Sequence, residues 1–171
     1  EKGLDTLVKL NPTLLGHDRV RSLLDGLGWD HVRLDPHGFT KDLAWDAAVP
    51  MLRRLLDVAR RAGRTFGVKL TNTLATANTR GVLPGDEMYL SGRALYPLSI
   101  ALAADLATAF DGRLPMSLSG GAAAWNLAAV LDAGLEPVTL ATELLKPGGY
   151  GRLKQLAEIA DTFGGTRPPQ A

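Results

Sequence analysis

The chain has 171 residues, of which 46% are hydrophobic and 22% charged, and its 19 basic and 18 acidic residues leave a formal net charge of +1. These numbers are ordinary for one globular domain, and they exclude a disordered segment and argue against a dedicated nucleic-acid binder. The absence of cysteine excludes disulfides and any cysteine-ligated zinc or iron–sulfur site within this chain. No apolar run approaches the length of a membrane span and no signal-peptide pattern opens the chain, so we expect a cytoplasmic protein.

Short apolar runs alternate with amphipathic segments along the chain. The runs end at proline, asparagine, serine or glycine, as buried strands do, whereas the longer segments repeat their apolar residues with helical spacing. In chain order we expect a strand at 4–10, a helix at 18–27, a strand at 31–35, a helix at 43–62, a strand at 65–70, a helix at 95–110, a strand at 114–118, a helix at 123–133, a strand at 137–141 and a helix at 150–163.

Three segments interrupt this alternation. Pro50 lies inside the helical pattern at 43–62, which predicts a kink or two helices. Residues 71–90 show little periodicity and are rich in Thr, Asn, Gly and Pro, so we expect a long loop of the functional or mobile kind. Residues 164–171 have the composition of a linker, and the domain is therefore expected to span 1–163.

Five strands that alternate with helices predict an α/β fold with a parallel sheet, either doubly wound or part of a (β/α)₈ barrel. The last two units favour the barrel, because glycine pairs follow both of their strands, at Gly120–Gly121 and Gly148–Gly149. In TIM barrels the loops after strands seven and eight commonly bind phosphate. We therefore expect the C-terminal portion of a TIM barrel, with about five βα units, although both glycine pairs can equally be simple turns.

Five segments carry a resemblance to a known family: VKLNPTLLG (8–16), VKLTNT (68–73), MYLSGRALYPL (88–98), SLSGG (117–121) and TLATELLKPGGY (139–150). They resemble bacterial selenate reductase subunits of the YgfK type, large flavin and iron–sulfur oxidoreductases. More distantly, the chain from Thr71 onward is similar to the FMN barrel of dihydroorotate and dihydropyrimidine dehydrogenases. The resemblance implies FMN as a cofactor and electron transfer to iron–sulfur centres, whose ligands must lie outside this chain.

The resemblance also implies which residues contact the cofactor. A lysine on a central strand of such barrels lies near the flavin, and a cation there stabilises the reduced anion. Ten residues match the positions that contact the cofactor in such barrels, near the ring, along the approach to the cofactor or in the phosphate loops. They are Lys9, Lys69, Asn72, Ser91, Gly92, Ser119, Gly120, Gly121, Thr142 and Glu143. Glu143 departs from the pattern, because a carboxylate repels phosphate and only its backbone N–H suits the role.

The dehydrogenases carry a Cys or Ser base on a mobile loop, and this chain offers no equivalent cysteine. The catalytic base is therefore unknown, and no spacing of His, Asp or Glu predicts a metal site. One alternative is a degenerate barrel without chemistry that acts as a structural or docking module. In either case the expected partners are other redox domains of the same parent chain. Open strand edges further predict that the fragment forms homo-oligomers, with no nucleic acid or membrane as a partner.

Overall fold

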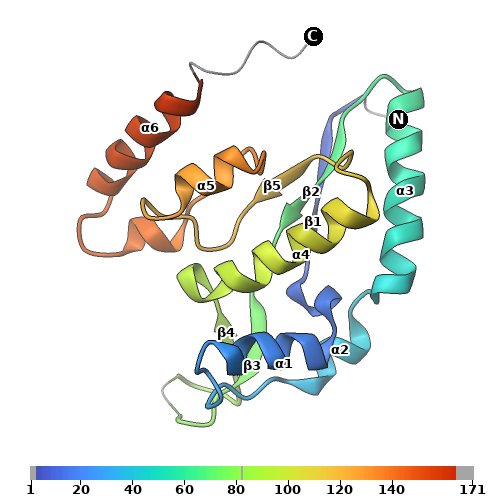
Figure 1. The fold of residues 1–171 in the computed structure, drawn as a ribbon. Helices are drawn as coiled ribbons and strands as arrows, with labels where there is room; N and C mark the ends of the chain where they lie inside the picture. Colours follow the sequence, from blue (N-terminus) through green and yellow to red (C-terminus); the bar gives the residue numbers. More distant parts are fainter. Residues whose placement is uncertain (1–2, 82, 165–171) are drawn as a thin grey trace.

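A parallel sheet forms the centre of the molecule in the computed structural model, which describes residues 3–81 and 83–164 (Figure 1). Its strands β1 (Thr6–Leu10), β2 (Phe66–Leu70) and β5 (Met116–Leu118) lie in the order β1-β2-β5. A further parallel bridge joins Leu118 to Val138, so the segment at 137–141 continues the same order. Neighbours in the sheet thus follow one another in sequence, as in a barrel wall.

Helices connect and cover these strands. The α-helices are α1 (His17–Gly26), α2 (Pro36–Lys41), α3 (Trp45–Arg61), α4 (Tyr96–Ala109), α5 (Leu127–Asp132) and α6 (Gly151–Gly164). Single 3₁₀ turns lie at η1 (Pro12–Leu15), η2 (Gly92–Leu95) and η3 (Thr142–Leu145). None of the helices in the described part of the chain is long and apolar enough to cross a membrane.

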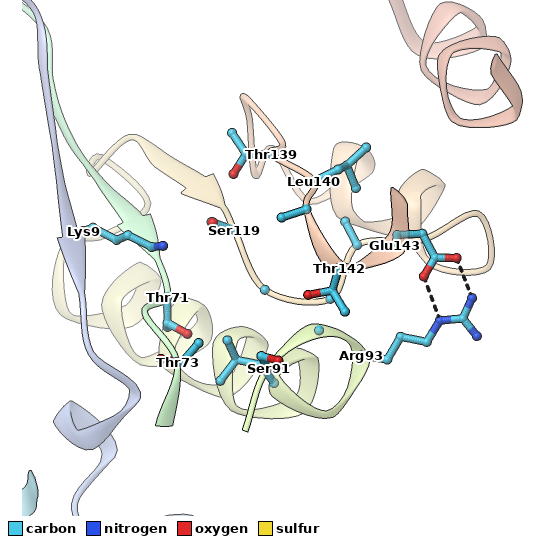
Figure 2. Close-up of a pocket in the computed structure, with 16 residues that line it drawn as sticks. Lys9, Thr71, Thr73, Ser91, Arg93, Ser119, Thr139, Leu140, Thr142 and Glu143 are labelled. Atoms are coloured by element: carbon cyan, nitrogen blue, oxygen red, sulfur yellow. Dashed lines mark hydrogen bonds and ion pairs between the residues drawn. The ribbon is translucent and has the colours of Figure 1, made fainter. Parts of the chain in front are cut away.

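The strand register places Lys9 beside Lys69 and Lys69 beside Ser117, so these three side chains share one face of the sheet. Lys9 is exposed, and Leu7 on the same face is 40% exposed. Figure 2 shows the Lys9 side chain extending from this face toward the loops that follow β5. Parallel sheets are normally covered on both faces, and the described residues cover this one only in part.

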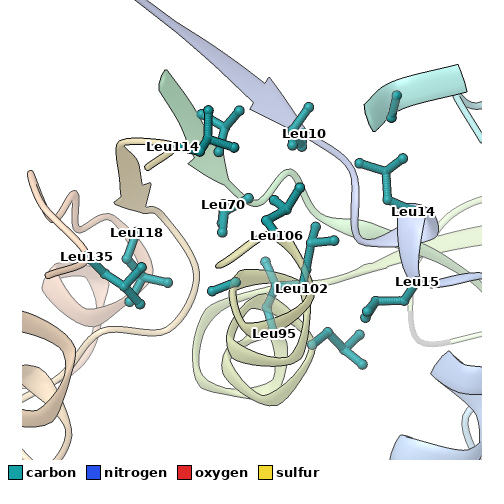
Figure 3. Packing of buried hydrophobic residues seen from close by; sticks show 14 of the residues in the cluster. Leu10, Leu14, Leu15, Leu70, Leu95, Leu102, Leu106, Leu114, Leu118 and Leu135 are labelled. Carbon is teal, nitrogen blue, oxygen red and sulfur yellow. The ribbon is translucent and has the colours of Figure 1, made fainter. Parts of the chain in front are cut away.

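The other face of the sheet carries the hydrophobic core. Leu10, Leu70 and Leu118 are register neighbours on this face, and each is at most 4% exposed. They pack against Leu102 and Leu106 of α4, which are fully buried (Figure 3). Burial of each such leucine favours folding by about 2 kcal/mol, so this leucine layer fixes α4 against the sheet.

Three predictions for strands and loops need correction. The segment 137–141, expected to be a strand, forms only the single bridge at Val138. The segment 31–35 is not a strand of the sheet, because only Leu34 forms a bridge, an antiparallel one to Thr76. Its charged residues Arg33 and Asp35 make burial on both faces costly, whereas β2 is buried at four of its five positions. The segment 71–90, expected to be a loop, contains an antiparallel hairpin of β3 (Leu74–Ala77) and β4 (Glu87–Leu90).

The helix predictions were closer. α3 is one continuous helix that contains Pro50, rather than two helices. The segment expected to be helical at 123–133 is shorter, since α5 begins only at Leu127. α6 ends at Gly164, and the rest of the expected tail, 165–171, lies outside the described residues.

Candidate functional site

A pocket of about 280 Å³ opens where the strands of the central sheet end (Figure 2). Lys9 enters it from β1, with its amine directed toward the opposite wall. The loop after β5 and the segment after the Val138 bridge form that wall, and residues 91–93 after β4 close the lower side. Because parallel strands end at one edge of a sheet, residues far apart in the sequence meet here.

Eight of the ten residues expected to contact a cofactor line this pocket: Lys9, Ser91, Gly92, Ser119, Gly120, Gly121, Thr142 and Glu143. Lys69 does not line it, although it is the register neighbour of Lys9. Asn72 lines a neighbouring cavity instead. Lys9 and Lys69 occupy the same position in the two similar motifs VKLN and VKLT, but only Lys9 reaches the pocket.

The glycines of the pocket wall allow three loops to touch. Gly92 and Gly121 have φ of +60° and +76°, a conformation that favours glycine. A Cβ on Gly92 would lie 2.7 Å from Cγ2 of Thr142, and one on Gly121 would lie 2.5 Å from the carbonyl oxygen of Gly92. A Cβ on Gly120 would collide with Oγ of Ser99. The glycines thus have a packing role in addition to any role toward a ligand.

Glu143 is the buried centre of a charge cluster at the rim. Its carboxylate accepts hydrogen bonds from Nη2 of Arg93 at 2.7 Å, from Nη1 of Arg152 at 2.6 Å and from Nζ of Lys146 at 3.1 Å. The bond from Arg93 is the main cause that lowers the pKa of Glu143 to about 2, with a further contribution from Lys146 and against the opposing effect of burial. The carboxyl group is therefore ionised, and three cations surround one anion.

The sequence reasoning missed these three cations. Lys146 follows Glu143 by three residues, a spacing that places two side chains on one side of a helical turn and was a usable signal. Arg93 and Arg152 reach Glu143 from other elements, η2 and α6, and only the fold brings them together.

Hydroxyl groups supply most of the remaining polar atoms of the pocket. Thr73, Ser91, Ser119 and Thr139 line it, and Thr71 bonds Ser99 through their buried hydroxyls at 3.1 Å. Hydroxyls and one ammonium group suit an oxygen-rich anion such as a phosphate. No histidine lines the pocket, and the residues that the structure describes contain no group of three His, Asp or Glu able to hold a metal.

Comparison with known proteins defines the class of this chain. Residues 1–168 match the family model described as "Oxidoreductase YgfK, N-terminal TIM-barrel domain". The chain therefore belongs to the family of N-terminal TIM-barrel domains of oxidoreductase YgfK.

Two relatives are each named "Putative oxidoreductase YgfK", one from Escherichia coli strain K12 and one from Escherichia coli O157:H7. Each is 56% identical to this chain over 153 residues, which is 90% of the chain. The chain spans only 15% of the length of these relatives. No solved structure matches it.

Proposed function

We propose that this domain holds the phosphate end of an FMN cofactor in the Lys9 pocket and serves as the flavin-binding barrel of a multidomain oxidoreductase. In such a protein the flavin accepts and donates electrons, and iron–sulfur centres elsewhere in the parent chain exchange them with it. The residues 137–141 and the three strands of the sheet would then be part of a barrel of about five βα units. A selenium oxyanion as the final substrate is part of the same proposal.

One observation carries the proposal. Residues from five separate parts of the sequence converge on one pocket, and half of them are positions that resemblance to FMN barrels singled out. The Lys9 amine faces the glycine loop after β5, which is where a phosphate would be held between a cation and backbone N–H groups. The amides of Gly120 and Gly121 have no hydrogen-bond acceptor among the described residues, so they are available to such a ligand.

The pocket fits part of the cofactor rather than all of it. A volume of about 280 Å³ is at the lower end for sites that enclose a whole small molecule. It accommodates a phosphate and the adjoining chain of hydroxyls, while the ring system would extend along the open face of the sheet. Lys69 is on that face, next to Lys9, and would lie beside the ring rather than the phosphate.

The test is the visible absorption spectrum of the purified chain after incubation with FMN and gel filtration, with Lys9→Gln and Lys69→Gln compared. We expect flavin bands in the spectrum of the unchanged chain. Lys9→Gln should lose most of the intensity of these bands, whereas Lys69→Gln should keep at least half of it. The second variant removes the same charge from the neighbouring strand, so it controls for general electrostatic effects. Flavin retention that is equal in all three proteins, or absent from all, contradicts the proposal.

A second candidate function is a structural or docking module that has lost its chemistry. It is favoured by Glu143, the only carboxylate among the described residues that line the pocket, because three cations bind this carboxylate and it is not available as a general base. The same spectra distinguish the two candidates, since a docking module binds no flavin in this pocket.

A further inference from the structure

A second cavity, of about 300 Å³, lies beside the Lys9 pocket and differs from it in chemistry. Thr73, which follows β2, lines both cavities, so the two cavities adjoin at this residue. Among the residues that the structure describes, those lining the second cavity include two amides and two carboxylates but no lysine or arginine. The polar side chains are those of Asn11, Thr13, Asp35, Asp42, Asn72, Thr73 and Tyr89.

A chain of hydrogen bonds fixes the orientation of the amide side chains that line this cavity. Asp42 accepts from Nδ2 of Asn11 at 2.8 Å and from the hydroxyl of Thr13 at 2.7 Å. Since an ionised carboxylate only accepts, Asn11 must present its NH₂ group to Asp42 and its oxygen to the other side. That oxygen accepts from Nδ2 of Asn72 at 2.6 Å.

The charge of Asp42 therefore determines the orientation of both amides, and the chain ends at the side-chain oxygen of Asn72. The backbone N–H of Asn72 also donates to the carbonyl of Leu10 at 2.8 Å, which holds the residue against the end of β1. The side-chain oxygen of Asn72 has no hydrogen-bond donor among the described residues. The bonds from Asn11 and Thr13 both go to Oδ2 of Asp42, so neither of them occupies Oδ1.

We propose that this cavity binds a neutral or cationic group that donates N–H bonds, such as an amidine or an amide, with Asn72 and Asp42 as its acceptors. Acceptors outnumber donors here, and the carboxylates of Asp35 and Asp42 repel anions. The Lys9 pocket has the opposite preference, so the two cavities select different groups on either side of Thr73. The proposal does not depend on flavin binding.

The experiment uses two small probes of the same shape and opposite chemistry, acetamidinium and acetate. Each is titrated at millimolar concentration and constant ionic strength into the ¹⁵N-labelled chain, and the amide resonances are followed by NMR. We expect acetamidinium to shift the side-chain amides of Asn11 and Asn72 and the backbone amide of Thr73 in a saturable way. Acetate should bind at least about tenfold more weakly, because it offers no donor.

Two variants and a control separate binding from folding. Asp42→Asn keeps the shape of the side chain and removes the charge, and we expect it to weaken acetamidinium at least fivefold. Asn72→Leu should abolish the saturable shift. Asp132→Asn removes a charge from an exposed position at the end of α5 and should leave the titration unchanged. Equal shifts with acetate, no shift of these resonances with acetamidinium, or full binding by Asp42→Asn would each overturn the proposal.

Discussion

Arg93 binds Glu143 through two parallel contacts, from Nη2 to Oε1 at 2.7 Å and from Nε to Oε2 at 3.2 Å. The pair joins η2 to η3 directly beside the point where Gly92 meets Thr142. Such a bidentate geometry is more specific than a single ion pair, and it fixes the two loops that form one side of the Lys9 pocket. The carboxylate is 5% exposed, so its loss leaves the three cations without their shared partner.

We expect Glu143→Gln to destabilise the domain by about 2–3 kcal/mol, since it removes a buried charge from three cations that remain close together. Urea unfolding followed by circular dichroism measures the loss. Glu158→Gln, which changes an exposed position of α6, is the matched control and should lie within about 0.5 kcal/mol of the unchanged chain. A similar stability for both variants would show that the cluster has no structural role.

Stability should also fall in acid because of Glu143. Its pKa is about 2 in the folded chain against a reference value of 4.5, so folding is favoured at pH values above the reference value. This contribution disappears as the pH falls from about 4.5 toward 2. It amounts to about 2–3 kcal/mol after allowance for the solvent exposure of the cations. Urea unfolding at pH 6 and pH 3 should show a little more than half of this loss, because pH 3 is still above the folded pKa, and Glu143→Gln should make the difference between the two pH values smaller by that part.

Gly120→Ala should destabilise the domain by about 2 kcal/mol, because the new methyl group collides with the hydroxyl of Ser99. Ser99→Ala on its own also costs stability, since it removes the buried bond to Thr71. In the double variant the collision is gone, so its loss should be at least about 1 kcal/mol smaller than the sum of the single losses. Additive losses would show that Gly120 is not constrained by Ser99.

Pro50→Ala should stabilise the domain by about 1–2 kcal/mol. Proline inside a helix lacks the N–H for one backbone bond, and its removal outweighs the added freedom of the unfolded chain. Pro97 is the matched control, because it lies in the first turn of α4, where no such bond is lost. A thermal melt compares the two variants, and an equal or lower melting temperature for Pro50→Ala than for Pro97→Ala would contradict the prediction.

The sequence predicted the α/β class, the central strands and most helices because their apolar patterns reflect burial. The strand at β2 is an apolar run in a buried position, and α4 carries the leucines that cover it. The pattern at 31–35 was misleading, because two apolar residues between charged ones also suit the edge of a hairpin. The hairpin was not predicted because its two strands are only four residues long and the segment between them shows little periodicity.

Resemblance identified half of the residues that line the pocket, including Glu143, but it could not identify the three cations around Glu143. Lys9, Ser119 and Thr142 belong to recognisable motifs, so their positions were predictable from the sequence. Arg152 lies nine residues from Glu143 on another helix, and no local pattern relates them. Asn72 lies in the neighbouring cavity, where its side chain donates to Asn11, and no local pattern relates these two residues, which are 61 positions apart.

Phosphate recognition in the Lys9 pocket is tested most directly by comparing FMN with riboflavin, which differ only in the phosphate. Quenching of flavin fluorescence by the chain gives both dissociation constants. We predict that FMN binds at least about tenfold more tightly than riboflavin, and that Lys9→Gln removes most of this difference, because a charge-assisted contact to phosphate is lost. Equal affinities for the two flavins in the unchanged chain would contradict a phosphate site in this pocket.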